Sequence, residues 1–365
     1  MTSNDATASG TQMNAHHRAG IVRLVIPDVL RGVAIVAMLV AHANVFLPHT
    51  PGAVGFLAGN INDLASPLFA LVMGMSAQIV ANRSRTPGIT YLQQVIRGLV
   101  LIVLGVWMAT WGSWVAIILA HLGVLLIVGA AIVLLRTKTV IAIALAVAII
   151  SSPLNAWAKQ QVWAYTNGDA VREIASWIAI SPHYRLTNLL PFFLLGALVL
   201  RHGMKRDSVL WSMLAIAPIA YLVRPVSEKF LGLPESVSGD YRDTLHDVGL
   251  VFLAYAIVVL LVTLKVGAWK RFVDAVFVPL RGCGQVALSL YLLHVALIAA
   301  FNVQYGRPPD NNYVGWVIIV PVMIAIGWAW WRYVGTGPVE WLLGFVTGRR
   351  KPLLWPREAR PTSVN

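Results

Sequence analysis

The stretch PDVLRGVAIVAMLVAHAN, residues 27–44, has charged side chains only near its start and stays apolar from there to His42. A helix needs about 20 such residues to cross the hydrocarbon core of a bilayer. With its flanking residues this stretch is long enough, and similar runs recur along the chain. We therefore predict an all-α integral membrane protein, a bundle of about ten transmembrane helices.

The predicted helices are separated by more polar segments and are expected at 28–47, 64–82, 96–114, 116–135, 139–157, 187–201, 208–223, 247–265, 283–303 and 313–334. Polar residues dominate both ends of the chain. We predict a disordered cytoplasmic tail at 1–22, a membrane domain at 23–348 and a basic, polar cytoplasmic tail at 349–365.

The composition supports this class of protein. Of the 365 residues, 58% are hydrophobic and only 12% are charged, whereas soluble domains carry about 25% charged residues. The net charge of +13 fits basic cytoplasmic loops better than nucleic-acid binding, so we expect no nucleic-acid partner. The single cysteine, Cys283, excludes an intrachain disulfide and a thiolate cluster, and we expect no metal site.

Lysine and arginine predict the orientation, because cytoplasmic loops carry an excess of both. If the N-terminus is inside, the outer side keeps only Lys159, Arg172, Arg185, Arg224, Lys229, Arg242 and Arg307. The asymmetry holds loop after loop and favours an even number of helices. We expect a multi-pass protein of the plasma (inner) membrane with both ends cytoplasmic.

Two predicted outer segments, 158–186 and 224–246, are long. Long connections usually bind something or are disordered. The first is rich in tryptophan and tyrosine, which anchor chains at a membrane interface and also stack on sugar rings. The second is acidic.

Three histidines fall within predicted spans: His42, His121 and His294. Ionisable groups at membrane depth are costly and mark functional sites or hydrogen-bonded packing positions. A neutral imidazole is also the side chain best suited to act as a general base. Tyr291 precedes His294 by three residues, so both lie on one helix face that lines a cavity or a helix contact.

The first predicted helix combines two kinds of polar residue. Asp28 and Arg31 are three residues apart and share a face, and Asp28 also suits the helix N-cap. His42 lies eleven residues beyond Arg31, about 16 Å along the axis and on nearly the same face. Arg31 is either an ordinary inner anchor or a contact for a long, phosphate-tailed donor threaded through the bundle.

Two other Arg-Gly pairs, Arg97-Gly98 and Arg281-Gly282, begin predicted outward-running helices. Glycine permits close backbone approach, and helix N-termini favour anions. With Arg31 these residues form either a phosphate cradle or three independent topology anchors. Asp63 either caps the second helix or orients a catalytic group.

Several of these residues stand in motifs of a known superfamily. The sequence Asp28-Val-Leu-Arg31-Gly32, the apolar run to His42 and the later SPLFALVMGMS (66–76) resemble the transmembrane acyltransferase superfamily. This group includes the heparan-alpha-glucosaminide N-acetyltransferase-like bacterial proteins, membrane acyltransferase family three and related bacterial families of unknown function. The segment SLYLLH (289–294) is similar to one in family three, and GPVEWL (337–342) resembles a signature of another branch.

The resemblance implies a cytosolic acyl-CoA donor, with acetyl-CoA favoured, and an acceptor hydroxyl or amine on the far side. It places the catalytic histidine at His42 or at His49, with Asp63 or Asn44 orienting it, and we favour His42. We assign Arg31, Arg97, Arg281 and Asp28 to the donor site, and His121, Tyr291 and His294 to the substrate cavity.

The predicted function is thus transfer of an acetyl or similar short acyl group to an envelope saccharide or glycolipid, without a permanently bound cofactor. The expected partners are the lipid bilayer, acyl-CoA and that acceptor, and a homodimer is compatible with the sequence. One alternative is a transporter or flippase of a lipid-linked or anionic small molecule with a histidine proton relay. Another is a scaffold in which His42 has no catalytic role.

Overall fold

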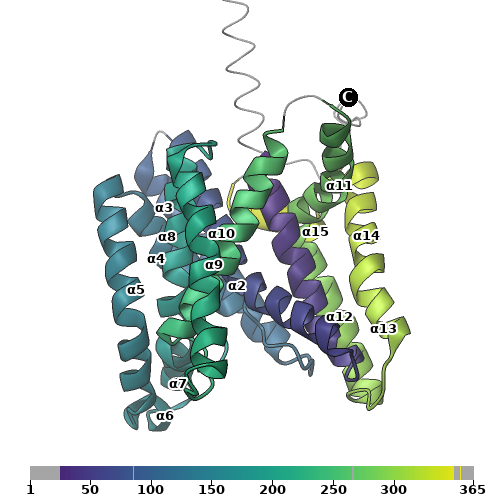
Figure 1. The fold of residues 1–365 in the computed structure, drawn as a ribbon, viewed down its shortest axis with the longest axis horizontal. Helices are drawn as coiled ribbons and strands as arrows, with labels where there is room; N and C mark the ends of the chain where they lie inside the picture. Colours follow the sequence, from purple (N-terminus) through teal and green to yellow (C-terminus); the bar gives the residue numbers. More distant parts are fainter. Residues whose placement is uncertain (1–24, 85, 265–266, 349–353, 355–365) are drawn as a thin grey trace, which may run out of the picture.

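The computed structural model describes residues 25–84, 86–264, 267–348 and 354. The predicted tails lie almost entirely outside these ranges. Within them the chain folds into a bundle of helices without strands (Figure 1), as predicted. Eight helices are long and apolar enough to span a membrane, and two further apolar helices are shorter.

The eight long helices are the first helix (Val25–Phe46), α2 (Gly52–Arg83), α3 (Pro87–Ala109), α5 (Thr137–Lys159), α9 (Ser208–Lys229), α10 (Tyr241–Val262), α12 (Ala287–Tyr305) and the segment Tyr313–Val334 with α13 (Tyr313–Val317) and α14 (Met323–Ala329). The shorter two are α4 (Leu119–Val133) and α8 (Leu186–His202). These ten helices correspond to the ten predicted segments.

Some helices were not predicted. The outer segment 158–186 contains α6 (Trp163–Thr166) and α7 (Asp169–Ala175), α11 (Ala268–Gln285) precedes α12, and α15 (Pro338–Val346) follows the last span. The second helix also begins at Gly52, so most of the loop predicted before Asp63 is helical. Asp63 lies inside this helix and does not cap it. Asp28 likewise lies inside the first helix, which already includes Val25.

Glycines bring the central helices into close contact. A Cβ on Gly74 of α2 would lie 1.8 Å from the Phe193 carbonyl oxygen, and one on Gly196 of α8 would lie 1.8 Å from the Leu71 oxygen. Helices in membranes associate through such small residues, because lipid offers no hydrophobic driving force. The α2–α8 crossing therefore fixes the centre of the bundle.

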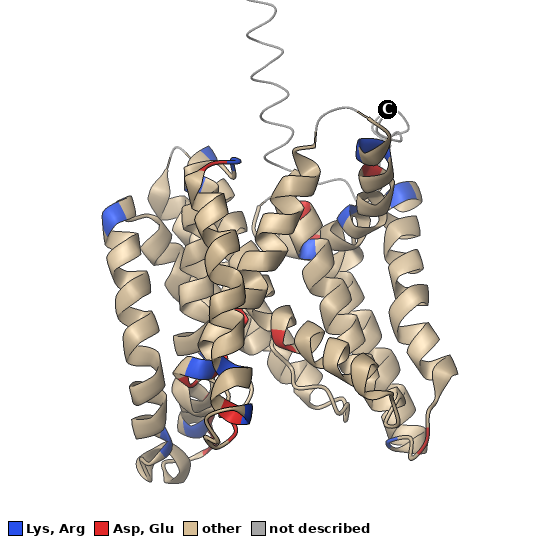
Figure 2. Cartoon of the chain, viewed as in Figure 1, with Lys and Arg blue, Asp and Glu red and all other residues tan. Residues whose placement is uncertain are grey.

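Charged residues divide between the two ends of the bundle. Figure 2 shows lysine and arginine at the upper ends of several helices, on the face where the first helix begins. This face is the one predicted to be cytoplasmic, and we call it the inner face. Acidic residues gather with several arginines in the opposite, outer half, where the functional site lies.

Candidate active site

A pair of histidines joins the first helix to α12. The Nδ1 atom of His42 lies 2.9 Å from Nε2 of His294, and the two rings stack with their planes 14° apart. The His294 side chain is fully buried. Two residues that are far apart in the sequence therefore form one polar unit within the apolar bundle.

Hydrogen bonding assigns the protons of this pair. Nδ1 of His294 lies 3.0 Å from the carbonyl oxygen of Leu290, so this nitrogen carries the proton and donates. Nε2 of His294 is then an acceptor, and the Nδ1–H group of His42 donates a hydrogen bond to it. The remaining nitrogen of His42, Nε2, is left with a free lone pair. This is the protonation state that a general base requires.

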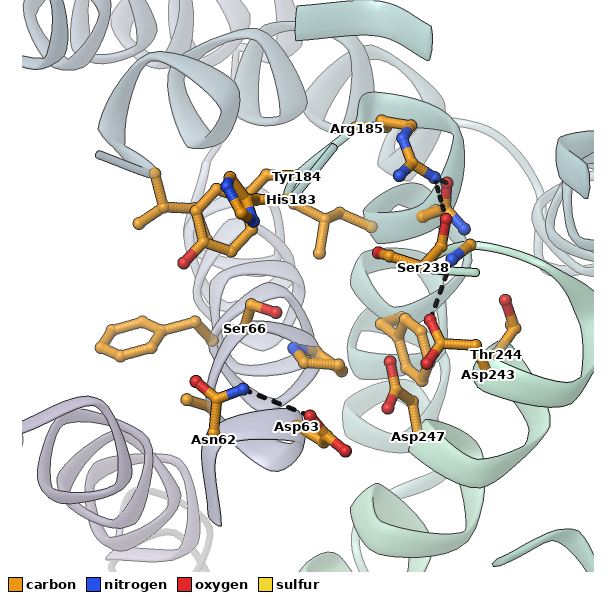
Figure 3. Close-up of a pocket in the computed structure, with 18 of the residues that line it drawn as sticks. Asn62, Asp63, Ser66, His183, Tyr184, Arg185, Ser238, Asp243, Thr244 and Asp247 are labelled. Atoms are coloured by element: carbon orange, nitrogen blue, oxygen red, sulfur yellow. Dashed lines mark hydrogen bonds between the residues drawn. The ribbon is translucent and has the colours of Figure 1, made fainter. Parts of the chain in front are cut away.

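His42 lines a cavity of about 350 Å³ in the outer half of the bundle. The walls come from the first helix, α2, the segment before α8, the end of α9, the loop at 236–239 and the start of α10. Figure 3 shows polar side chains from several of these elements converging on the space. A base with a free lone pair therefore borders a polar chamber of substrate size.

A charged cluster forms the wall opposite the apolar core. Nη1 of Arg224 lies 2.9 Å from Oδ2 of Asp63 and 3.4 Å from Oδ1 of Asp243. Asp243 also accepts a hydrogen bond from the backbone of Gly239. The cluster thereby ties together α2, α9 and α10, and it gives this wall both donors and acceptors.

Asp247 adds a further carboxylate to the same wall. Its nearest ion-pair contact among the described residues is the Nδ1 atom of His246 at 3.8 Å, and its side chain is 18% exposed. A carboxyl group that lines a cavity normally has a hydrogen-bond partner, either protein or water. Asp247 is therefore placed to accept a hydrogen bond from a ligand.

Arg185 supports the roof of the cavity from within the protein. Its side chain is 1% exposed and donates to the carbonyl oxygens of Ser181, Pro182 and Ser238. Gly239 has a φ of +84°, and a Cβ there would lie 2.1 Å from Nη1 of Arg185. This position therefore admits only glycine. Beside this arginine, burial raises the pKa of Tyr184 to about 12.

The other predicted catalytic residues lie elsewhere or have other partners. His49 is 70% exposed and faces Asp310, and it does not line the cavity. Asn44 belongs to the short turn that ends the first helix and is also absent from the cavity wall. Asp63 lines the cavity, but its ion-pair partner is Arg224. The side chain hydrogen-bonded to the His42 ring is that of His294, one of the residues predicted to line the substrate cavity.

The structure corrects the placement of the predicted donor residues: Arg31 lies near the start of the first helix, but Arg97 lies in the middle of α3 and Arg281 near the end of α11, so neither of these two Arg-Gly pairs begins a helix. Arg31 pairs with Asp28 at 3.2 Å and donates to the Ser76 hydroxyl at 2.6 Å. The glycines of the three Arg-Gly pairs all pack against other helices: Gly32 against Leu280, Gly98 against Gly123 and Gly282 against Trp328. These glycines serve helix contact. A phosphate site made by Arg31 with Arg97 of α3 and Arg281 of α11 stays a prediction.

Of the remaining predicted cavity residues, Tyr291 supports the histidine pair. Its ring centroid lies 5.2 Å from that of His294, and its hydroxyl accepts the backbone N–H of Ile118. His121 lies at the start of α4 and borders a different cavity.

Comparison with known families gives this geometry a chemical class. A family model described as an acyltransferase domain matches residues 24–332. The chain belongs to the acyltransferase 3 family. The match spans the first helix, α12 and every element that lines the His42 cavity. The protein is thus a multi-pass membrane acyltransferase, as its motifs predicted. None of the curated proteins compared with it matches.

The charged cluster of the cavity was not predicted from the sequence. Arg224, Asp243 and Asp247 stood in a segment interpreted as an acidic outer connection. In the structure they occupy the end of α9 and the first turns of α10. The available signal was the spacing of Asp243 and Asp247 by four residues, which puts both carboxylates on one helix face.

Proposed function

We propose that this acyltransferase moves an acetyl or similar short acyl group from cytosolic acyl-CoA to a hydroxyl or amine of an envelope saccharide or glycolipid. The observation that carries the proposal is the hydrogen bond between His42 and His294 at the edge of the outer cavity. It leaves one imidazole nitrogen free beside a space that an acceptor can enter.

In the proposed reaction, Nε2 of His42 takes the proton of the acceptor hydroxyl or amine while that oxygen or nitrogen attacks the thioester carbonyl carbon. The new C–O or C–N bond forms, the C–S bond breaks, and the leaving thiolate takes the proton from His42. His294 holds the ring of His42 in orientation, and the hydrogen bond from Nδ1–H of His42 to His294 is kept throughout. A positioned base of this kind contributes about 10²- to 10⁴-fold in rate.

The lining of the outer cavity favours a saccharide acceptor. Carboxyl oxygens accept hydrogen bonds, and Asp63 and Asp247 both line the cavity. Hydroxyl groups of a sugar supply the matching donors, and Arg224 offers donors to sugar oxygens. An anionic acceptor would instead meet three carboxylates, since Asp243 lies on the same wall.

We assign the donor to the inner side. Arg31 lies eleven residues before His42 on the same helix, about 16 Å away along its axis. An acyl-CoA whose phosphates contact the basic inner face would extend its long arm along this helix toward His42. With this donor side, the protein would lie in the plasma membrane with both ends cytoplasmic.

The test uses the purified protein in nanodiscs with radiolabelled acetyl-CoA and a panel of envelope saccharides and glycolipids. We expect acyl transfer by the wild type and a loss of about 10²-fold or more in His42→Ala. The exposed His49→Ala is the matched control and should keep wild-type activity.

Folding of each variant is checked by thermal unfolding in detergent. Equal activity of the two variants would refute the assignment of the base. Substrate flux into vesicles without acyl transfer would instead favour the transporter that the sequence left open.

A further inference from the structure

A second cavity of about 260 Å³ lies at the outer end of α3. Its walls come from the last turns of α3, from residues 113–121 at the start of α4 and from the outer segment 173–184. His183 and Tyr184 border both this cavity and the active-site cavity. No step of the proposed reaction uses it.

His121 is the unusual feature of this second cavity. Its side chain is 8% exposed, and neither ring nitrogen has a hydrogen bond of ordinary geometry, although the Ile117 carbonyl is close enough to act on the ring. Its contact with Tyr184 is an edge-on ring contact. A buried imidazole whose nitrogens lack hydrogen bonds of ordinary geometry is costly, because its polar atoms have lost water and are not fully compensated. His121 is therefore available to form a hydrogen bond with a ligand in the cavity.

The opposite side of the cavity is apolar and continuous with the surface that faces lipid. Gly105, Val106 and Ala109 of α3 line it. On the same helix Val103 is 67% exposed and Trp107 is 55% exposed. Exposed apolar residues on a spanning helix contact lipid chains, so an amphiphile can reach His121 from the bilayer.

The depth and charge of the cavity restrict the ligand further. It lies where α3 ends and α4 begins, near the membrane interface, and Trp177 is among its lining residues. Tryptophan is enriched at membrane interfaces. Among its described lining residues other than histidines, Glu173 is the one acidic or basic side chain besides the Tyr184 phenol. An anionic head would face this carboxylate without a lysine or arginine to balance it. A hydroxyl group can both donate to and accept from an imidazole.

We propose that this second cavity binds the uncharged, hydroxyl-bearing head of an amphiphile from the adjacent leaflet. A hydroxyl of the head pairs with His121, and the hydrocarbon chain lies along the lipid-facing side of α3. The proposal does not depend on acyl transfer, because it concerns binding at residues that the reaction does not use.

The test is photolabelling of the full-length protein in phosphatidylcholine nanodiscs. The probe is an alkyl glucoside with a diazirine in its chain, and labelled peptides are mapped by mass spectrometry. We expect label on residues 105–120, competition by octyl glucoside, and no competition by phosphatidylglycerol. His121→Leu keeps the apolar packing but removes the hydrogen bond, and should reduce this label by about 3- to 10-fold.

Three further variants control for misfolding and for labelling of the neighbouring site. Ala109 is exposed at the mouth of the cavity, so Ala109→Trp should fill it and abolish the label, while Val103→Trp on the same lipid-facing helix should not. His42→Ala should label as the wild type does. Label spread evenly over lipid-facing helices such as α5, label unchanged in His121→Leu and Ala109→Trp, or label lost in His42→Ala would each overturn the proposal.

Discussion

Replacing His294 by leucine removes the partner of the proposed base without touching the base itself. Nε2 of His294 accepts a hydrogen bond from the Nδ1–H group of His42, with a distance of 2.9 Å between the two nitrogens. Once His42 has taken the acceptor proton, this bond joins an imidazolium to a neutral acceptor. Hydrogen bonds to charged groups contribute about 1.5–3 kcal/mol, and about 1.4 kcal/mol corresponds to tenfold in rate. We therefore expect kcat to fall about 10- to 150-fold.

Glutamine at the same position provides the matched variant. Its amide oxygen can occupy the place of Nε2 and accept the same proton, so His294→Gln should stay within about tenfold of the wild type. Initial rates are measured in nanodiscs at saturating donor and acceptor. The KM for acyl-CoA should not change in either variant, because His294 lies on α12 among apolar residues and far along the bundle from Arg31.

Two results would refute this account of the histidine pair. The first is a folded leucine variant with wild-type kcat, which would mean that His42 needs no partner. The second is a glutamine variant as impaired as the leucine variant while both unfold at the wild-type temperature. That outcome would mean that the ring of His294, and not its acceptor nitrogen, is what matters.

Three further predictions concern the scaffold around the site. Arg224→Leu leaves three carboxylate partners without their cation, so the melting temperature should fall by the equivalent of about 1–3 kcal/mol, with a raised KM for the acceptor. Burial raises the pKa of Glu340 above its ordinary value of 4.5, so ionising this group weakens the folded state. Relative to Glu340→Gln, the wild type should therefore lose melting temperature as the pH rises above 4.5. Gly74→Ala puts a Cβ 1.8 Å from a carbonyl oxygen of α8 and should lower folded yield sharply, whereas Gly59→Ala, which meets nothing within 4 Å, should not.

The spans were predictable from the sequence because their signal is local. Each apolar run is long enough to cross a bilayer by itself, and all ten predicted segments have a helical counterpart. The helices that were missed are either short, as α6, α7 and α15 are, or interrupted by charged residues. In α11, for example, Lys270, Arg271 and Asp274 interrupt the run, so no long apolar window exists although the segment is helical.

The site was predictable only in part, because its geometry depends on contacts across the bundle. Polarity at membrane depth identified His42 and His294 as candidates one by one. Nothing in the sequence shows that these two histidines, 252 positions apart, are joined by a hydrogen bond. The same holds for Asp63 and Arg224, which are 161 positions apart. Hydropathy assigned the arginine to a loop, and only the packing of α2 against α10 brings its partners together.

The last helix shows how a remote segment supports the histidine pair. Glu340 of α15 accepts hydrogen bonds from the backbone N–H groups of Leu288 and Ser289 and from the Ser289 hydroxyl. It thereby satisfies donors that the first turn of α12 leaves unpaired. α12 carries His294 less than two turns further on. The GPVEWL segment lies beyond the matched acyltransferase region, yet it holds the start of the helix that positions the proposed base. Substitution of Glu340 should therefore lower kcat as well as stability.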